Sequence, residues 1–302
     1  MSEEKVPVIA RREKKFKLGI IGHGFVGQAV DYGFTNPAVE KFIVDPKYGE
    51  ANTLSDLCEW DPQCVFICAP TPSKENGSVD SSIVEEAVMK LINLTDAFIV
   101  IKSTITPDVV DRLMQIDKRI VYHPEFLQEG NAKRDYIHAP FRIVGVNDQS
   151  ASQHLEMLYN VFSICNPSQM IPMSGVEAAF FKYAVNNFLA MKLTFFNQLY
   201  DLIGDYGGNY QTVARALSAD QRIGYSHKTI PGPDGKRGFG GACFPKDLDA
   251  MIFFADNKTE TDLKVLKAVR EVNNAIRSQY EQDEREKSNN VNYGQTEEEQ
   301  QD

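Results

Sequence analysis

The sequence is short of the residues that would mark a disulfide framework or a zinc centre. It has five cysteines, an odd number, and no Cys-x-x-Cys pair occurs among them. A disulfide-stapled secreted domain and a structural zinc site are therefore not indicated, and we expect no bound metal. Cys64 and Cys68 lie in an apolar run and are expected to be small core residues. The expected location is the reducing cytoplasm.

The chain also lacks a long apolar run and an excess of basic residues. No apolar stretch approaches the roughly 20 residues that cross a bilayer. The charged segment Met1 to Lys15 has no apolar signal region. Eight acids against two bases in Glu281 to Asp302 supply −6 of the net charge of −10, so the rest of the chain is only mildly acidic. Neither a membrane partner nor a nucleic-acid partner, which needs clustered Lys and Arg, is indicated.

Short apolar runs alternate with helical stretches through the first half of the chain. This alternation predicts an α/β fold, a Rossmann-type, doubly wound parallel sheet over residues 16–173, after a mobile arm at 1–15. The predicted strands are 17–21, 41–44, 64–68, 97–101, 119–122 and 141–146, and the predicted helices among them are 26–34, 82–91 and 107–115.

From Ser174 the pattern changes to a mainly helical domain, predicted over 174–280. Ser174 and Glu177 form an S-x-x-E capping box, which opens a helix predicted to run to about Ile203 with Gly204 as its stop. We expect this long helix to join two domains or to make a homodimer. Further helices are predicted over 210–217, 245–255 and 261–278. Residues 281–302 have only Val291 and Tyr293 as apolar residues and are predicted to be a disordered acidic tail.

A glycine-rich turn follows the first predicted strand. Gly22-His23-Gly24-Phe25-Val26-Gly27 matches G-x-G-x-x-G between a strand and a helix, the context of a dinucleotide-binding fingerprint. Asp45, at the end of the next strand, is placed to bind a ribose 2′-hydroxyl and to repel a 2′-phosphate. We therefore predict NAD as the cofactor, although Lys47 leaves room for a phosphate. The alternative is a plain strand-turn-helix. The predicted cofactor contacts are Gly22, Gly24, Phe25, Val26, Gly27 and Asp45.

Two later turns lie at the same predicted sheet edge. Pro70 and Thr71 follow the third predicted strand, and Ser103 and Thr104 follow the fourth. Ligands of open α/β sheets bind beyond the carboxyl ends of the strands, so these residues are predicted to reach the nicotinamide or its ribose. Ordinary turn chemistry is the alternative.

Cys243 is the candidate nucleophile. Pro245 suits the first turn of a helix, which places Cys243 just before a helix N-terminus, where positive potential favours a thiolate. Asp247 lies in the same first turn and is a candidate base or water-orienting group. The alternatives are a buried structural cysteine and an acid that merely favours the helix start.

Two further pairs have the spacing of neighbours on one helix face. Lys182 and Asn186, at i and i+4 on the long helix, are candidates for stabilising an oxyanion. Glu125 and Glu129 would share a face if a helical turn begins there, and paired acids are candidates for proton transfer. The alternatives are a solvated lysine and a solvated turn.

Taken in order, these motifs resemble the nucleotide-sugar dehydrogenases, the UDP-glucose/GDP-mannose dehydrogenase family. The likeness runs from about Gly19 to Tyr280. It is carried by an ordered series: the glycine fingerprint, Pro-Thr-Pro, Lys-Ser-Thr, Pro-Glu-Phe-Leu-x-Glu-Gly, Lys-x-x-x-Asn with Leu-Ala-x-Lys, Arg-Ile-Gly, and Phe-Gly-Gly-x-Cys-x-Pro-Lys-Asp. The resemblance implies oxidation of a primary alcohol to a carboxylate with two NAD.

The resemblance also implies roles for the catalytic candidates. Cys243 would capture an aldehyde as a thiohemiacetal that becomes a thioester, and Lys182 and Asn186 would stabilise the oxyanion. Asp247 and a water near Thr104 would handle protons. Glu125 would assist hydrolysis of the thioester, and Glu129 would lie between cofactor and substrate. The implied contacts with a nucleotide-sugar substrate are the backbone of Phe126 and Leu127, with Arg222 and Gly240.

The sequence departs from the family after Tyr280. Family members continue into a second Rossmann-like domain that holds the nucleotide, and here the chain enters a polar segment instead. The loop from Ile230 to Gly238 is also enlarged. Two other functions stay open: a two-electron hydroxyacid dehydrogenase that does not need Cys243, and a non-catalytic NAD-binding subunit that needs a partner chain.

Overall fold

The structure is a computed structural model that describes residues 14–48 and 52–294. Of the predicted arm at 1–15, residues 1–13 lie outside this part of the chain. A seven-stranded sheet runs in the order β2-β1-β3-β4-β5-β6-β7. Its strands are β1 (Phe16–Ile21), β2 (Val39–Val44), β3 (Cys64–Ile67), β4 (Phe98–Ile101), β5 (Ile120–Tyr122), β6 (Phe141–Gly145) and β7 (Gln169–Met173).

The Rossmann-type sheet is confirmed with two corrections. Neighbouring strands are parallel except β5 and β6, which run antiparallel through the pair Tyr122 and Gly145. Strand β7 was not predicted. It lies at the edge of the sheet and has no fully buried residue, and Pro172 interrupts its short apolar stretch Met-Ile-Pro-Met.

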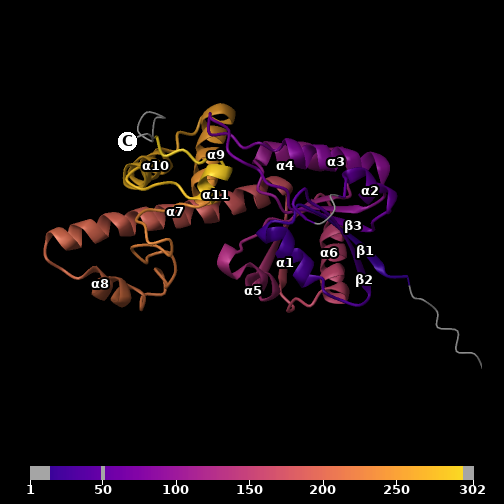
Figure 1. Cartoon of the computed structure of the whole chain (residues 1–302), viewed down its shortest axis with the longest axis horizontal. Helices are drawn as coiled ribbons and strands as arrows, with labels where there is room; N and C mark the ends of the chain where they lie inside the picture. The colour runs from indigo at the N-terminus through magenta and orange to yellow at the C-terminus, as the bar shows by residue number, and fades with distance from the viewer. Residues whose placement is uncertain (1–13, 49–51, 295–302) are drawn as a thin grey trace, which may run out of the picture.

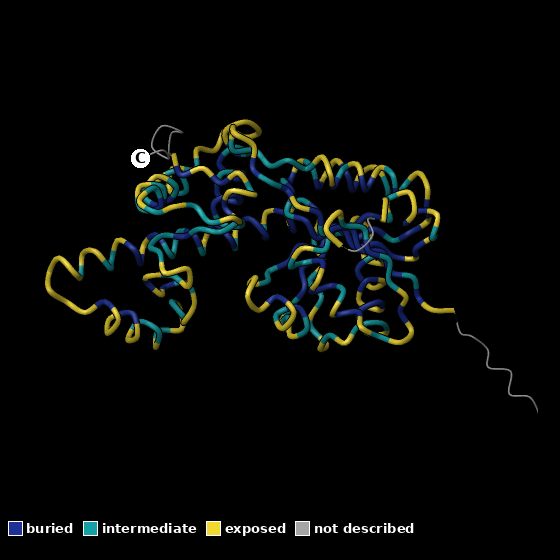
Figure 2. Tube along the Cα trace, viewed as in Figure 1, coloured by how far each residue is buried: buried dark blue, intermediate teal, exposed yellow. Residues whose placement is uncertain are grey.

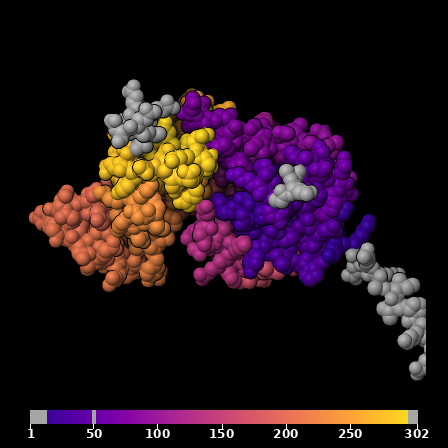
Figure 3. Space-filling view, viewed as in Figure 1, coloured from indigo at the N-terminus to yellow at the C-terminus, as the bar shows by residue number. Residues whose placement is uncertain are grey.

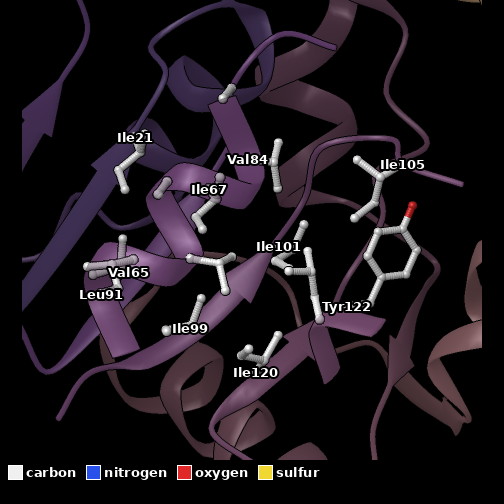
Figure 4. Close-up of a cluster of buried hydrophobic side chains, with 14 of the residues drawn as sticks. Ile21, Val65, Ile67, Val84, Leu91, Ile99, Ile101, Ile105, Ile120 and Tyr122 are labelled. Atoms are coloured by element: carbon white, nitrogen blue, oxygen red, sulfur yellow. The ribbon is translucent and has the colours of Figure 1, made fainter. Parts of the chain in front are cut away.

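Helices cover both faces of the sheet (Figure 1). One face carries α1 (Phe25–Gly33), α5 (Ala132–Ile137) and α6 (Gln149–Phe162). The other carries α2 (Leu54–Glu59), α3 (Ser82–Leu94) and α4 (Pro107–Ile116). Side chains alternate between the two cores: Ile99 and Ile101 of β4 pack toward α3 and α4, whereas Val100 packs on the opposite face. Figure 4 shows the core on the face that carries α2, α3 and α4.

The long helix α7 (Gly175–Asp205) begins as predicted. The Ser174 hydroxyl accepts a hydrogen bond from the Glu177 N–H at 3.3 Å, and the Glu177 carboxylate accepts one from the Ser174 N–H at 2.8 Å. Its stop differs from the prediction, because Gly204 is still helical. The left-handed conformation that ends the helix is taken by Gly207, with φ at +76°.

Helix α7 connects the sheet to the helical domain. Its first turns place Ala178 and Ala179 in the core of the sheet. Farther along, α9 (Phe244–Lys258) and α10 (Lys264–Arg277) pack on it around Ala190, Leu248 and Val269. The far end projects with α8 (Tyr210–Leu217) folded back beside it, and its surface is largely exposed (Figures 1 and 2). No helix in the described ranges has the length and apolar character needed to cross a bilayer.

The predicted disorder of the tail is wrong for residues 281–294; residues 295–302 lie outside the described chain. The segment contains α11 (Glu284–Ser288) and folds back onto the molecule. Arg277 and Glu286 are buried as an ion pair at 2.6 Å, and Tyr293 is buried beside them. Polar residues elsewhere in the chain hold this segment in place. The composition of the segment alone does not predict that order.

Candidate active site

A cavity of about 870 Å³ lies at the carboxyl ends of β1, β2, β3 and β4 and reaches the first turn of α9. This is the edge where open α/β sheets bind ligands. Predicted site residues that line it are Gly22, Gly24, Phe25, Val26, Asp45, Pro70, Thr71, Ser103, Thr104, Glu125, Glu129, Cys243 and Asp247. The described residues contain no cluster of three or more His, Cys, Asp or Glu side chains that could hold a metal ion.

The glycine turn has the geometry of a phosphate cradle. Gly22 has φ at +87°, and a Cβ there would lie 2.5 Å from the Cys68 carbonyl oxygen. A Cβ on Gly27 would lie 2.0 Å from the Gly22 carbonyl oxygen, so α1 packs close only because Gly27 has no side chain. At Gly24 a Cβ would meet nothing within 4 Å, which leaves the start of α1 open to the cavity. Backbone N–H groups at such a helix start suit a pyrophosphate.

Asp45 lies at the end of β2 and faces the same turn. Its carboxylate accepts hydrogen bonds from the backbone N–H of His23 at 2.6 Å and of Lys47 at 2.7 Å. These bonds hold the carboxylate at the cavity wall, where it suits a ribose diol and disfavours a 2′-phosphate. The residues present therefore fit NAD.

The hydroxyls of the two later turns bond to the backbone. Thr71 donates to the Thr104 carbonyl oxygen at 2.9 Å, and Ser103 donates to the Ala69 carbonyl oxygen at 2.7 Å. These bonds tie the turn after β3 to the turn after β4. Thr71 and Ser103 can thus offer a ligand only their oxygen lone pairs, unless these bonds break.

Cys243 precedes α9 directly, as Pro245 indicated. The helix begins at Phe244, Cys243 is its N-cap residue, and Pro245 occupies its first turn. The expected thiolate is not what the site favours. Burial, together with the carboxylates of Asp247 and Glu125, raises the pKa of the Cys243 thiol to about 11, although Lys182 and Lys246 act in the opposite direction. At neutral pH the unliganded protein therefore holds a protonated thiol.

Lys182 forms a buried ion pair with Glu125. Its ammonium donates to the Glu125 carboxylate at 3.0 Å and to the Glu125 carbonyl oxygen at 2.7 Å, and both side chains are buried. Burial acts to lower the pKa of Lys182, but Glu125, Asp247 and Cys243 outweigh it and raise that pKa. The predicted helical turn at Glu125 is absent, because the 3₁₀ helix η1 (Glu129–Asn131) begins only at Glu129.

Asp247 forms a second buried cluster beside the thiol. One oxygen accepts from the Asn186 amide at 2.5 Å and the other from the Lys246 ammonium at 2.6 Å. Lys182 and Asn186 thus both point to the site from one face of α7, as their spacing predicted. Neither lines the cavity itself, since Glu125 and Asp247 stand in front of them.

The four predicted substrate contacts lie outside this cavity. Phe126 packs on Phe141 and Phe181, and Leu127 packs at the opposite core. Arg222 is exposed and paired with Asp220. Gly240 lies against the C-terminal segment. Their contact with a substrate stays a prediction.

Three charged residues among those that line the cavity are not predicted site residues. Lys246 holds Asp247, and Lys102 donates to the His123 carbonyl oxygen at 3.0 Å, with burial lowering the pKa of Lys102 to about 8. Arg285, from the C-terminal segment, pairs with Glu129 at 2.8 Å. Lys102 and Lys246 belong to motifs quoted above, whereas no local signal marks Arg285.

Known protein families match most of the chain. The model of the UDP-glucose/GDP-mannose dehydrogenase family, NAD binding domain, matches residues 53–163, and that of the central domain matches residues 176–275. UDP-glucose 6-dehydrogenase of Rickettsia felis is 37% identical over 216 residues, which are 68% of this chain and 46% of that protein. The enzyme of that name from Pseudomonas aeruginosa is 35% identical over 223 residues, 69% of this chain and 48% of that protein.

Solved structures show the same likeness. A UDP-glucose dehydrogenase from Pyrobaculum islandicum superposes with a TM-score of 0.74 and 26% identity, covering 89% of this chain and 70% of that one. The chain spans about half the length of the relatives it matches by sequence.

Proposed function

Because the chain belongs to the UDP-glucose/GDP-mannose dehydrogenase family, we propose that it oxidises the primary alcohol of a nucleotide sugar, similar to UDP-glucose, to a carboxylate. One observation carries the proposal: Cys243 lines the same cavity as the glycine turn and Asp45. A nucleophilic thiol beside a dinucleotide site suits oxidation of an alcohol in two steps through a covalent adduct.

NAD, when bound, would accept the hydrides. Gly22, Gly24, Phe25, Val26 and Gly27 would hold its pyrophosphate at the start of α1, and Asp45 would hold the adenosine ribose. Pro70, Thr71 and Ser103 would border the nicotinamide end, and Glu129 would lie between cofactor and substrate.

Cys243 would form the covalent intermediate. Its sulfur would add to the aldehyde carbon of the half-oxidised substrate, giving a thiohemiacetal, and oxidation of that adduct would leave a thioester. A thiol with a pKa of about 11 must lose its proton as the sulfur–carbon bond forms. Asp247, whose charge acts on the thiol, is the candidate base, and Thr104 would help to hold a water for the proton transfers.

The two buried clusters around Glu125 and Asp247 would supply the groups that stabilise the oxyanion formed on the substrate. Lys182 and Asn186 would stabilise it by exchanging their present partners, Glu125 and Asp247, for the substrate oxygen. Glu125, once free of Lys182, would assist attack of water on the thioester. The backbone of Phe126 and Leu127, with Arg222 and Gly240, would contact the nucleotide part of the substrate.

The test is the stoichiometry of the reaction. The purified chain should form two NADH for each molecule of UDP-glucose, or of another UDP- or GDP-sugar in a substrate panel, that it consumes. One NADH for each substrate would mean a two-electron hydroxyacid-type oxidation, and activity that appears only with a co-purified partner would mean a non-catalytic subunit. Either result would reject the proposal.

Replacement of the thiol gives a second test. Cys243→Ala should abolish net conversion to the acid, whereas Cys68→Ser, at the other cysteine that lines the cavity, should retain it. Burial raises the pKa of Cys68 to about 12, so at neutral pH an even smaller fraction of Cys68 than of Cys243 is ionised. Full activity of Cys243→Ala would overturn the assignment.

We also propose that the chain forms a homodimer through α7. The helix exposes large apolar side chains along its projecting part, with Phe188, Phe195 and Leu202 each more than half exposed. Such residues on one helix form a surface that a second copy can cover. Sedimentation should give a dimer for the native chain and a monomer for Phe195→Glu/Leu202→Glu. A native monomer at micromolar concentration would contradict the proposal.

A further inference from the structure

The segment from Glu281 to Gly294 lies beyond both family matches, the later of which ends at residue 275, and yet its Arg285 and Asn289 line the cavity. Figure 3 shows it packed against the N-terminal domain. We propose that Glu286 in this segment is a positioning residue, which fixes the loop that carries Cys243. The proposal rests on the proposed role of Cys243 as nucleophile.

Glu286 is fully buried, and both of its carboxylate oxygens are bonded. One accepts from Arg277 at 2.6 Å, from the Tyr293 hydroxyl at 2.8 Å and from the Gly241 N–H at 3.2 Å. The other accepts from the Asp283 N–H at 2.9 Å. A buried carboxylate with this many donors is held in one place, because each lost bond would leave a buried polar group unpaired.

The bond to Gly241 is the link to the nucleophile, which lies two residues further on. Gly241 has φ at +75°, a conformation that glycine adopts without strain. The preceding Gly240 is in close contact as well. A Cβ there would lie 2.2 Å from the Arg277 guanidinium and 2.3 Å from the Glu286 carboxylate. The loop thus rests directly on the buried Arg277–Glu286 pair.

The same segment is also tied to the cofactor side of the cavity. The Ser73 N–H donates to the Asn289 carbonyl oxygen, and the Asn290 amide donates to the Ser73 carbonyl oxygen at 3.1 Å. Arg285 pairs with Glu129 at 2.8 Å. Glu286 therefore holds the thiol loop from a segment that is itself fixed to the NAD-binding domain. In this way the thiol keeps a set distance from the cofactor site.

The test measures the reactivity of each cysteine separately. The chain has five free cysteines, so iodoacetamide labelling followed by peptide mass spectrometry gives Cys243 and four internal references. In Glu286→Ala the freed loop should open locally, and Cys243 should be alkylated about tenfold faster at pH 8. Cys64, which is fully buried in the sheet, should stay protected. Glu284→Ala, at an exposed residue of the same helix, is the matched control and should leave all rates unchanged.

Two milder variants cover the case in which Glu286→Ala exposes Cys64 through loss of the fold. Glu286→Gln keeps the acceptor for Gly241 and should restore protection of Cys243, and Tyr293→Phe should loosen the loop only slightly. A rate at Cys243 that stays at the native value in Glu286→Ala, with Cys64 protected, would overturn the proposal. So would labelling of Cys64 and Cys243 in parallel in every variant. Labelling does not depend on turnover. If the native chain proves inactive but Glu286→Ala still accelerates labelling of Cys243, the proposed function is rejected and the positioning role of Glu286 stands.

Discussion

At the scale of residues, the pair of Lys182 and Glu125 has two partly opposed roles. As an ion pair it satisfies two buried charges that would each be costly alone. As catalytic candidates, both side chains must leave that pair to act on a substrate. The pair is therefore expected to stabilise the free protein and to exchange partners during the reaction.

A double-mutant cycle tests this coupling. Lys182→Met leaves Glu125 buried without its cation and should lower the free energy of unfolding by about 3–5 kcal/mol. The double variant with Glu125→Gln should lose less than the sum of the single losses, because neither charge then remains unpaired. Urea unfolding measures all three variants.

The control cycle uses Lys258 and Asp108, an exposed pair 3.4 Å apart. Exposed pairs contribute about 0–1 kcal/mol, so the control coupling should be close to zero. Equal coupling in the two cycles would contradict a stabilising role for burial of the Lys182–Glu125 pair.

Cys243 illustrates what local sequence can and cannot predict at this scale. Pro245 places the thiol at a helix start, and the structure confirms that position. The raised pKa of the thiol depends first on burial, then on Asp247 in the same helix turn and on Glu125, which lies more than a hundred residues away in the sequence. A local pattern therefore predicts where a side chain lies better than it predicts its charge.

At the scale of elements, the packing of α9 on α10 includes an acid in an unfavourable place. Asp249 of α9 is largely buried, and its carboxylate lies 3.5 Å from Arg270 of α10, beyond normal hydrogen-bond distance. Burial raises the pKa of Asp249 to about 6, with Arg270 opposing the shift. As pH rises from the ordinary value of 3.8 to about 6, the unfolded chain loses this proton first, so the fold becomes less stable.

Asp249→Asn should therefore stabilise the protein at high pH. At pH 8 the free energy of unfolding should rise by about 1–3 kcal/mol, since a shift of one pKa unit corresponds to about 1.4 kcal/mol. The gain should shrink as the pH falls toward 4. Urea unfolding at pH 8 and pH 5 measures the difference. Asp256→Asn, at a more exposed acid of the same helix, should change little, and equal effects of the two substitutions would reject the argument.

The elements that the sequence predicted are those whose signals are local. Strands β1, β3 and β4 are apolar runs that end at turns, and α7 begins at a capping box. Strand β7 was missed because Pro172 interrupts its short apolar stretch, and proline is tolerated in a strand only at a place such as a sheet edge, which the sequence does not reveal. Helix α11 was missed because its order depends on Arg277 and on the loop before Cys243, and these contacts exist only in the folded chain.

At the scale of the whole molecule, the C-terminal segment links the two domains beside the cavity, which Arg285 and Asn289 help to line. One end of the link is the buried pair of Arg277 and Glu286, and the other consists of the bonds to Ser73 and Glu129. The other main connection is α7 itself, which packs on α4, β5 and β6 of the sheet domain.

Truncation tests whether this link stabilises the whole fold. A chain that ends at Tyr280 leaves the Arg277 guanidinium without Glu286, with Asp234 as its remaining anionic partner. Breaking a buried pair in this way should lower the free energy of unfolding by about 3–5 kcal/mol. A chain that ends at Gly294 keeps every contact of the segment named above and should unfold like the full chain. Thermal and urea unfolding of both chains measure this, and equal stability of the chain ending at Tyr280 would show that the segment only rests on a fold that is complete without it.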